Sequence, residues 1–331
     1  INRNYSFAVQ VPQGITAALP WSLPMRNTVI LSLAALGLIG ASVADARPAG
    51  KWRERIAERM AARSQASPAA ATPQTLSYGS NPLQVLDFYR AQGTAKPAPL
   101  VLFVHGGGWK RGSKDNAAGG WKQVHYPASG YAYASINYRL VPDATVEQQA
   151  ADVAAALAHL LTRADALGID RTRVVLMGHS AGAHLVALVG TDERYLRGAG
   201  LSFADLDGVI PIDGAAYDVP VQMQDGPKIM QDTYAQAFGT DPARQRALSP
   251  TLQAAAPNAP AFLIPHVQRP DGIRQSEALA AALRGAGARA DIASFEGTGL
   301  KGHGEINRSM GDPAYAATPV VDAWLKRVFA G

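Results

Sequence analysis

The chain of 331 residues contains no cysteine. Disulfide bonds, a catalytic thiol and metal sites with cysteine ligands are therefore excluded. A chain of this length buries enough surface to fold without covalent crosslinks. Its composition, 47% hydrophobic and 17% charged, is typical of a globular protein. We expect one large domain with appended segments.

The main part of the sequence also lacks an excess of charge of one sign. The whole chain has a net charge of +5, and most of this surplus lies in a basic segment at residues 51–63. From Ser64 to the end there are 23 basic and 23 acidic residues. The sequence therefore gives no indication of a basic surface for nucleic acid, and we expect no nucleic-acid partner.

No apolar run reaches the length of about 20 residues that a membrane-spanning helix needs. An apolar run at residues 28–41 follows Arg26 and leads to the sequence Ala44-Asp45-Ala46. A short basic start, an apolar stretch and an Ala-X-Ala end are typical of a secretory signal peptide. We therefore predict a signal peptide at residues 25–46, cleaved after Ala46, and a periplasmic or secreted protein without stable membrane insertion. Residues 1–24 are assigned no part in the working protein.

The remaining chain divides into a short extension and a catalytic body. Residues 47–75 contain a basic amphipathic stretch and a linker rich in Ala, Pro and Ser. We interpret this segment as a solvated helix and linker, with contact to an anionic membrane surface as the alternative. In residues 76–331, strands alternate with helices, which predicts an α/β domain with a mostly parallel, eight-stranded sheet flanked by helices.

The apolar patterns place each expected element. Strands are expected at 75–78, 83–89, 99–104, 131–137, 174–177, 206–212, 261–264 and 290–295, and helices at 146–166, 275–284 and 319–329. Residues 214–258 have no clear period and follow a late strand. We predict a small lid-like insertion there.

A serine lies in the motif Gly178-His179-Ser180-Ala181-Gly182, between an apolar strand and helix-forming sequence. The G-x-S-x-G pattern in this context indicates a sharp strand-to-helix turn that exposes the serine above the sheet. We therefore predict that Ser180 is a catalytic nucleophile. The alternative is a serine in an ordinary strand-to-helix loop.

A second motif, His105-Gly106-Gly107-Gly108-Trp109, follows the strand expected at 99–104. Consecutive glycines allow backbone N–H groups to approach a ligand closely, as an oxyanion hole requires. We expect donors from Gly107, Gly108 and Ala181, with Trp109 bordering the substrate. The alternative is a flexible glycine turn.

A serine nucleophile needs a general base and a carboxylate that orients it. Of the seven histidines, His303 is the best candidate, because it lies in Gly302-His303-Gly304 after the last expected strand, where we predict a loop. Asp271 follows the strand at 261–264 and gives the chain order Ser, acid, His. Its alternative role is a helix N-cap, and Asp213, after an earlier strand, is the substitute acid.

These motifs resemble those of the α/β-hydrolase superfamily, and more narrowly the esterase group that includes hormone-sensitive-lipase-like carboxylesterases and kynurenine formamidases. The resemblance spans about residues 76–330 and also includes Asn137-Tyr138-Arg139-Leu140. It implies an α/β-hydrolase fold, with Ser180 as nucleophile, His303 as base, Asp271 as its partner and the oxyanion hole named above. The sequence departs from the lipase-like branch, which has GDSAGG where His179 and Ala183 stand and a D-P-L segment that is absent around Asp271.

The leading hypothesis is an exported serine esterase that cleaves a small-molecule carboxylic ester through an acyl-enzyme. Neither a metal nor an organic cofactor is implied. One alternative is an arylformamidase, because the same residues open an amide. Another is a non-catalytic binding protein on the hydrolase fold.

Overall fold

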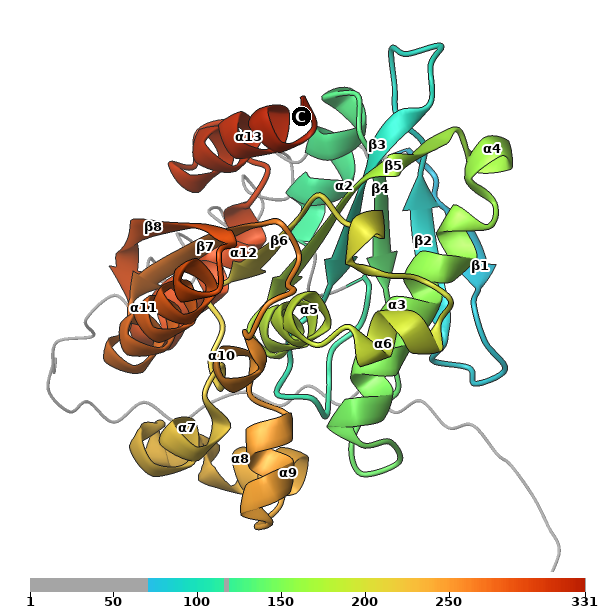
Figure 1. The fold of residues 1–331 in the computed structure, drawn as a ribbon. Coiled ribbons are helices and arrows are strands. Elements are labelled where there is room, and N and C mark those ends of the chain that lie inside the picture. The colour runs from blue at the N-terminus through green and yellow to red at the C-terminus, as the bar shows by residue number, and fades with distance from the viewer. Residues whose placement is uncertain (1–70, 116–118, 331) are drawn as a thin grey trace, which may run out of the picture. The chain divides into compact units, whose positions relative to one another are not determined.

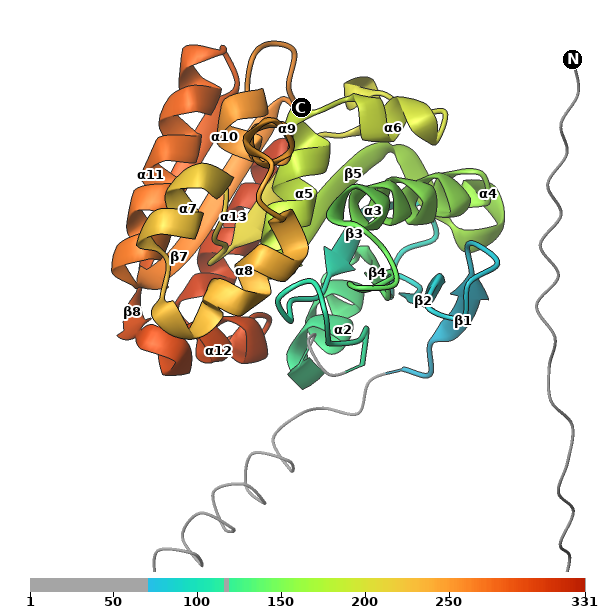
Figure 2. The same cartoon turned by 90° about the horizontal axis from the view of Figure 1, so that it is seen from below.

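The computed structural model describes residues 71–115 and 119–330. The predicted signal peptide, the basic helix and most of the linker lie outside the described residues. Figures 1 and 2 show the ribbon in two views. In the described part of the chain, no helix combines the length and the apolar character that crossing a membrane requires.

Eight strands form one sheet in the order β1-β2-β4-β3-β5-β6-β7-β8. The pairs β1–β2 and β2–β4 are antiparallel, and all other neighbours are parallel. The predicted α/β-hydrolase fold with a mostly parallel, eight-stranded sheet is therefore confirmed. The strands are β1 Gln74–Ser77, β2 Val85–Tyr89, β3 Ala98–Val104, β4 Ala132–Ile136, β5 Ile169–His179, β6 Gly208–Ile212, β7 Ala261–Gln268 and β8 Arg289–Thr298.

Helices connect these strands on both faces of the sheet. They are α2 Gly119–Ala128, α3 Val146–Leu161, α4 Ala164–Leu167, α5 Ala181–Thr191, α6 Arg194–Gly198, α7 Val219–Asp225, α8 Gln231–Phe238, α9 Pro242–Ala247, α10 Pro250–Gln253, α11 Pro270–Gly285, α12 Gly299–Ser309 and α13 Ala317–Val328, with 3-10 turns η1 Phe203–Asp205 and η2 Lys228–Met230. The helix expected at 146–166 is thus two helices, α3 and α4. A capping box formed by Thr145 and Gln148 begins α3.

Alternation along the strands divides the core into two layers, because successive side chains of a strand point to opposite faces. In β3, Leu100, Leu102 and Val104 pack with α3, α5 and α11. Val101 and Phe103 pack with α2, α12 and α13 on the other face. Figure 1 shows α3, α5 and α11 in front of the sheet.

The parallel strands end at one edge of the sheet, where ligands bind in open α/β folds. The glycine motif follows β3, Ser180 follows β5 and Asp213 follows β6. The predicted insertion folds as short helices, α7 to α10, and α7 to α9 lie beyond this edge in Figure 1. The view from below in Figure 2 therefore looks onto the insertion.

Candidate active site

Ser180 occupies a sharp turn between β5 and α5. Its φ of 58° and ψ of −117° lie in a region that residues other than glycine rarely adopt. A Cβ added to Gly182 would lie 2.1 Å from the carbonyl oxygen of Val104, so only glycine allows α5 to approach β3 this closely. The predicted strand–turn–helix geometry of the serine motif is confirmed.

The glycine loop lies directly against this turn. A Cβ on Gly106 would be 2.9 Å from Cβ of Ser180. Gly107 has a φ of 123° and Gly108 a φ of 61°, both conformations that favour glycine. Together with Ala181, the first residue of α5, these two glycines border the same cavity as Ser180. The first N–H groups of a helix have no partner within it, so the structure brings the three predicted donor residues to one place.

His105 is buried at the start of the loop. Its Nδ1 donates a hydrogen bond to the Gly106 carbonyl over 2.7 Å, and its ring stacks on Tyr138 with centroids 4.3 Å apart. Burial lowers the pKa of His105 to about 4. The ring is therefore neutral at physiological pH and fixes the glycine loop.

Trp109 lies in the wall of the cavity that Ser180 lines, and its role in bordering the substrate stays a prediction. It is 2% exposed. Its ring packs edge-on against Phe238 at 4.7 Å, and its Nε1 donates to His184 Nδ1 over 3.3 Å. These contacts join the glycine loop to α5 and the insertion.

His303 lies in helix α12, so the prediction of a loop at this position is wrong. Ile306 and Met310 bury one side of this segment in the core. The prediction of a loop rested on the glycines that flank His303. A Cβ on Gly302 would lie 2.5 Å from the carbonyl carbon of Gly297. Gly302 therefore permits close packing and does not break the helix. The Nε2 of His179 donates to the His303 carbonyl over 2.9 Å, which joins α12 to the serine turn.

The hydrogen-bond partner of His303 is Asp213, the substitute acid. His303 Nδ1 lies 2.6 Å from Asp213 Oδ2. Asp213 is fully buried at the end of β6, has a φ of 43°, and its Oδ1 accepts from the backbone N–H of Val267 over 3.2 Å. A hydrogen bond at Nδ1 selects the tautomer whose Nε2 accepts a proton.

A buried cation accompanies this carboxylate. Nε of Arg269 lies 3.0 Å from Asp213 Oδ2 as an ion pair, although its geometry does not meet that of a hydrogen bond. Burial raises the pKa of Asp213, but the hydrogen bond from His303 and the charge of Arg269 together outweigh burial. The net pKa of Asp213 is lowered, which keeps the carboxylate ionised.

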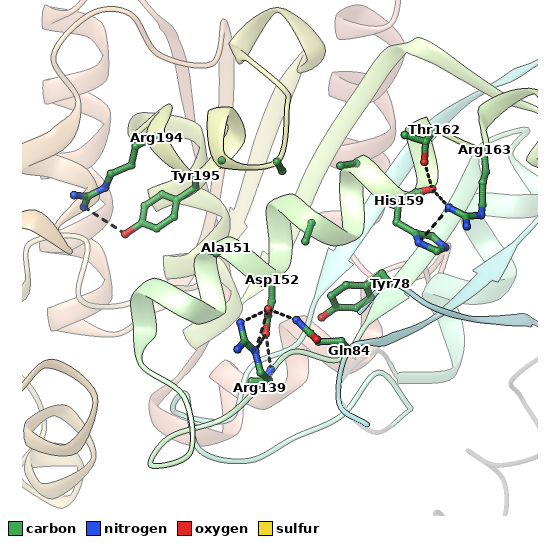
Figure 3. A pocket seen from close by; sticks show the side chains of 14 residues that line it. Tyr78, Gln84, Arg139, Ala151, Asp152, His159, Thr162, Arg163, Arg194 and Tyr195 are labelled. Atoms are coloured by element: carbon green, nitrogen blue, oxygen red, sulfur yellow. Dashed lines mark hydrogen bonds and ion pairs between the residues drawn. The ribbon is translucent and has the colours of Figure 1, made fainter. Parts of the chain in front are cut away.

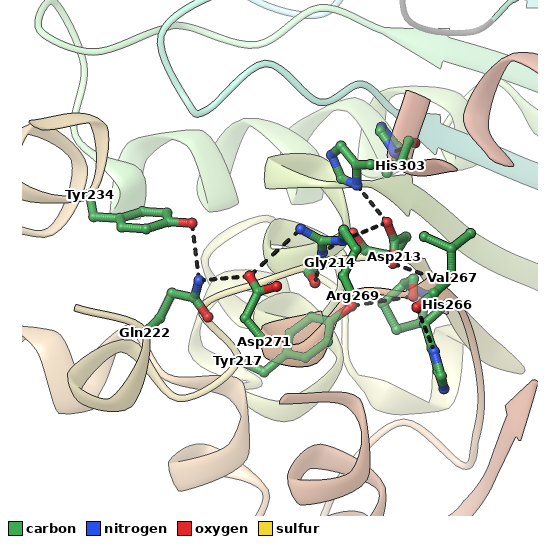
Figure 4. A network of polar contacts seen from close by, with 12 residues as sticks. Asp213, Gly214, Tyr217, Gln222, Tyr234, His266, Val267, Arg269, Asp271 and His303 are labelled. Carbon is green, nitrogen blue, oxygen red and sulfur yellow. Dashed lines mark hydrogen bonds and ion pairs between the residues drawn. The ribbon is translucent and has the colours of Figure 1, made fainter. Parts of the chain in front are cut away.

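The expected pairing of Asp271 with His303 is wrong. Asp271 lies in the first turn of α11, which begins at Pro270 and not near Gln275 as predicted. Its Oδ2 lies 3.6 Å from Nη1 of Arg269 and accepts a hydrogen bond from Gln222 over 3.2 Å. Proline at the first helical position starts the helix early, and this places Asp271 on the insertion side of Arg269 (Figure 4).

Ser180 and His303 line a cavity of about 430 Å³. Its wall contains Arg111 and Arg269 but no Asp or Glu among the described residues. Nowhere in residues 71–115 and 119–330 do three His, Asp or Glu side chains gather as a metal site would require. The arrangement combines the hydroxyl of Ser180, the imidazole of His303 held by the Asp213 carboxylate, and backbone N–H donors. These are the groups that acyl transfer requires.

A second cavity of about 570 Å³ lies beside α3 and α6 (Figure 3). Its most buried charge, Asp152, is bound by the backbone N–H, Nε and Nη2 of Arg139. The cavity contains neither of the sequence motifs. Arg139 and Asp152 form an ion pair there, whereas Ser180 and His303 line the smaller cavity, which is therefore the candidate active site.

Sequence reasoning missed three buried polar residues at the site: Arg269, Gln222 and Tyr234. Arg269 stands two residues before Asp271. A basic residue this near a candidate catalytic acid is the sequence signal that could have identified it. Gln222 and Tyr234 lie in the insertion, where no motif distinguishes them.

Comparisons with known proteins agree with this architecture. The BD-FAE family matches residues 86–283. Esterase LipC of Mycobacterium tuberculosis is 33% identical over 205 residues, 58% of this chain and 49% of LipC. Kynurenine formamidase of Danio rerio is 29% identical over 112 residues, 34% of this chain and 36% of that protein. The crystal structure of esterase B from Lactobacillus rhamnosis matches with a TM-score of 0.64 at 21% identity, covering 85% of this chain and 92% of that chain.

These similarities differ in what they establish. The chain spans half or less of the two curated relatives, and the likeness to esterase B concerns the fold. The family match covers more than half of the chain, from β2 into α11, and includes both Ser180 and Asp213. The chain has the α/β-hydrolase fold and belongs to the BD-FAE family.

Proposed function

We propose that this protein is an exported serine esterase that hydrolyses carboxylic esters. The observation that carries the proposal is the 2.6 Å contact between His303 Nδ1 and Asp213 Oδ2 beside the cavity that Ser180 lines. In this proposal Ser180 is the nucleophile, His303 the general base and Asp213 the residue that orients it.

The reaction proceeds in two stages. Ser180 Oγ attacks the ester carbonyl while His303 Nε2 takes its proton. The N–H groups of Gly107, Gly108 and Ala181 stabilise the oxyanion, and each such donor contributes on the order of 3 kcal/mol to lowering the barrier. The protonated imidazole then gives its proton to the leaving alkoxide, and water attacks the acyl-enzyme by the same path in reverse. The ionised Asp213 stabilises the imidazolium in both stages.

The test is to label the protein with a fluorophosphonate and to map the adduct. We expect the adduct on Ser180, and we expect Ser180→Ala to lose turnover of p-nitrophenyl acetate. Full turnover by Ser180→Ala, or labelling at another residue, rejects the proposal.

An arylformamidase is the second candidate, and the similarity to kynurenine formamidase favours it. The same nucleophile opens a formamide as well as an ester. Turnover of N-formylkynurenine compared with a short acyl ester separates the two activities. The proposed export favours ester cleavage outside the cytoplasm.

A further inference from the structure

Tyr234 of α8 is a polar residue of the cavity wall that the proposed chemistry does not use. It is 3% exposed and lines the cavity together with Ser180. Its ring lies edge-on to Trp109 with centroids 6.2 Å apart, and the methyl group of its neighbour Thr233 lies 2.8 Å from the position of a Cβ on Gly108. Tyr234 therefore stands next to the glycine loop, where a bound ester would lie.

The amide of Gln222 determines whether the Tyr234 hydroxyl accepts or donates a hydrogen bond between the two side chains. Its Nε2 donates to Tyr234 Oη over 3.0 Å and to Asp271 Oδ2 over 3.2 Å (Figure 4). The Asp271 carboxylate, beside Arg269, accepts hydrogen bonds only. A reversed amide would place Oε1 against this carboxylate, so Nε2 must face both oxygens.

Because the Tyr234 hydroxyl accepts from Gln222, its own proton is directed to another acceptor. Among the described residues, no hydrogen bond donated by Tyr234 Oη is present. Burial raises the pKa of Tyr234, and although the Gln222 hydrogen bond lowers it, the net pKa is raised. The hydroxyl is therefore a protonated donor at neutral pH, at the wall of the cavity.

We propose that Tyr234 donates a hydrogen bond to an oxygen of the bound ester, and that Gln222 and Asp271 are positioning residues that direct its proton. The inference rests on the proposed esterase function and names a substrate class: esters that carry an ether, hydroxyl or carbonyl oxygen close to the scissile group. The cavity wall suits such substrates, because its charged side chains, Arg111 and Arg269, are also donors.

The experiment compares esters that differ by one oxygen. p-Nitrophenyl methoxyacetate and butyrate form a pair that differs in the acyl half, and 2-methoxyethyl acetate and butyl acetate form a pair that differs in the alcohol half. In each pair the ratio of kcat/KM for the ether ester to that for the hydrocarbon ester is measured for wild type and variants. This ratio cancels changes that affect both esters equally.

In Tyr234→Phe we expect this ratio to fall about fivefold in at least one pair, the loss of one hydrogen bond. Asp271→Asn should lower the ratio in the same pair. The amide introduced at position 271 can donate a hydrogen bond to Gln222, so the Gln222 amide can turn over and present Oε1. This oxygen would then accept the hydrogen bond of the Tyr234 hydroxyl in place of the substrate. Tyr195→Phe is the matched control. Tyr195 is also buried, but it lines the cavity beside α3 and α6, and its ratios should equal those of wild type.

The outcomes separate this inference from the proposed function. Active Tyr234→Phe with wild-type ratios in both pairs overturns the inference alone, as does a lowered ratio in Tyr195→Phe of the same size. Wild-type ratios in Asp271→Asn overturn the positioning roles of Gln222 and Asp271. If wild type hydrolyses none of the four esters, the proposed function fails and the inference fails with it.

Discussion

At the scale of single residues, Asp213 is the carboxylate whose surroundings match the task of orienting an imidazole. One of its oxygens meets both His303 and Arg269, and the other accepts a backbone N–H. A buried carboxylate with three such partners is held in place and ionised. Asp271 has a cation and an amide beside it but no imidazole.

We therefore predict that Asp213→Asn and Asp271→Asn differ strongly. Loss of the carboxylate that holds the histidine tautomer should lower kcat by about 10⁴-fold in Asp213→Asn. The loss in Asp271→Asn should stay within about tenfold, because the partners of Asp271 are Gln222 and Arg269 and not the imidazole of His303. Steady-state kinetics with p-nitrophenyl acetate measure both. Equal losses, or a larger loss in Asp271→Asn, contradict the assignment.

His184 predicts a dependence of stability on pH. Its Nδ1 accepts from Trp109 Nε1 and its Nε2 donates to the Leu248 carbonyl, and burial lowers the pKa of His184 to about 4. The unfolded chain binds this proton near pH 6.5. Since the unfolded state takes up the proton first, the free energy of unfolding should fall as the pH drops from about 6.5 to about 4.

Urea unfolding at pH 7.5 and pH 5.0 measures this effect. His184→Gln keeps a donor and an acceptor but has no proton to bind, so its loss of stability between the two pH values should be smaller than that of wild type by about 1 to 2 kcal/mol. His105 and His179, whose pKa values burial also lowers, remain in this variant and retain part of the slope. The same loss in both proteins would show that His184 does not contribute.

At the scale of elements, the contact of β3, β5 and α5 positions the residues of the proposed reaction. Gly182 allows the first turn of α5 to touch the end of β3, where the glycine loop begins. This contact sets the separation of the proposed oxyanion donors from Ser180. A small displacement of the helix therefore changes both stability and rate.

We predict that Gly182→Ala destabilises the protein by about 2 kcal/mol through overpacking and lowers kcat as well. Gly198→Ala is its control, because Gly198 also lies in a helix, its φ is not positive and nothing approaches within 4 Å of its added Cβ. That variant should be neutral or slightly more stable. Thermal unfolding and p-nitrophenyl acetate turnover measure both. A Gly182→Ala protein with wild-type values would contradict the packing argument.

The sequence predicted the strands well, because apolar alternation and turn residues are local signals. All eight expected strands are present, with ends that differ by a few residues. The error at Asp271 arises from a distant contact, and the error at His303 arises from the packing of one glycine against another. Whether a glycine ends a helix or lets it pack depends on what lies against it, as Gly297 lies against Gly302. Which carboxylate reaches His303 depends on a contact between residues 90 positions apart, which no local pattern encodes.

At the scale of the whole molecule, the described domain contains every residue of the proposed chemistry. The site draws on the ends of β3, β5 and β6 and on α12, which parallel pairing brings to one edge. The predicted signal peptide and most of the extension lie outside the described residues. Export is therefore a separate prediction.

We predict that a secretion-competent host removes residues 1–46 of this chain. The Ala44-Asp45-Ala46 sequence should direct cleavage after Ala46 and leave a protein of 285 residues. Intact mass and N-terminal sequencing of periplasmic or culture protein measure the cut. Ala46→Pro, which blocks the site, should leave uncut protein in the membrane fraction. An intact N-terminus in wild type would refute the prediction.

The location of the paired carboxylate on β6 has a consequence for how such a protein diversifies. Its neighbour strand β7 leads instead to Asp271, which contacts the insertion. In the proposed mechanism, proton transfer and substrate choice thus depend on different strand ends. Directed evolution can keep Arg269, which pairs with Asp213, and randomise Asp271 and the insertion residues that face it to obtain new selectivity.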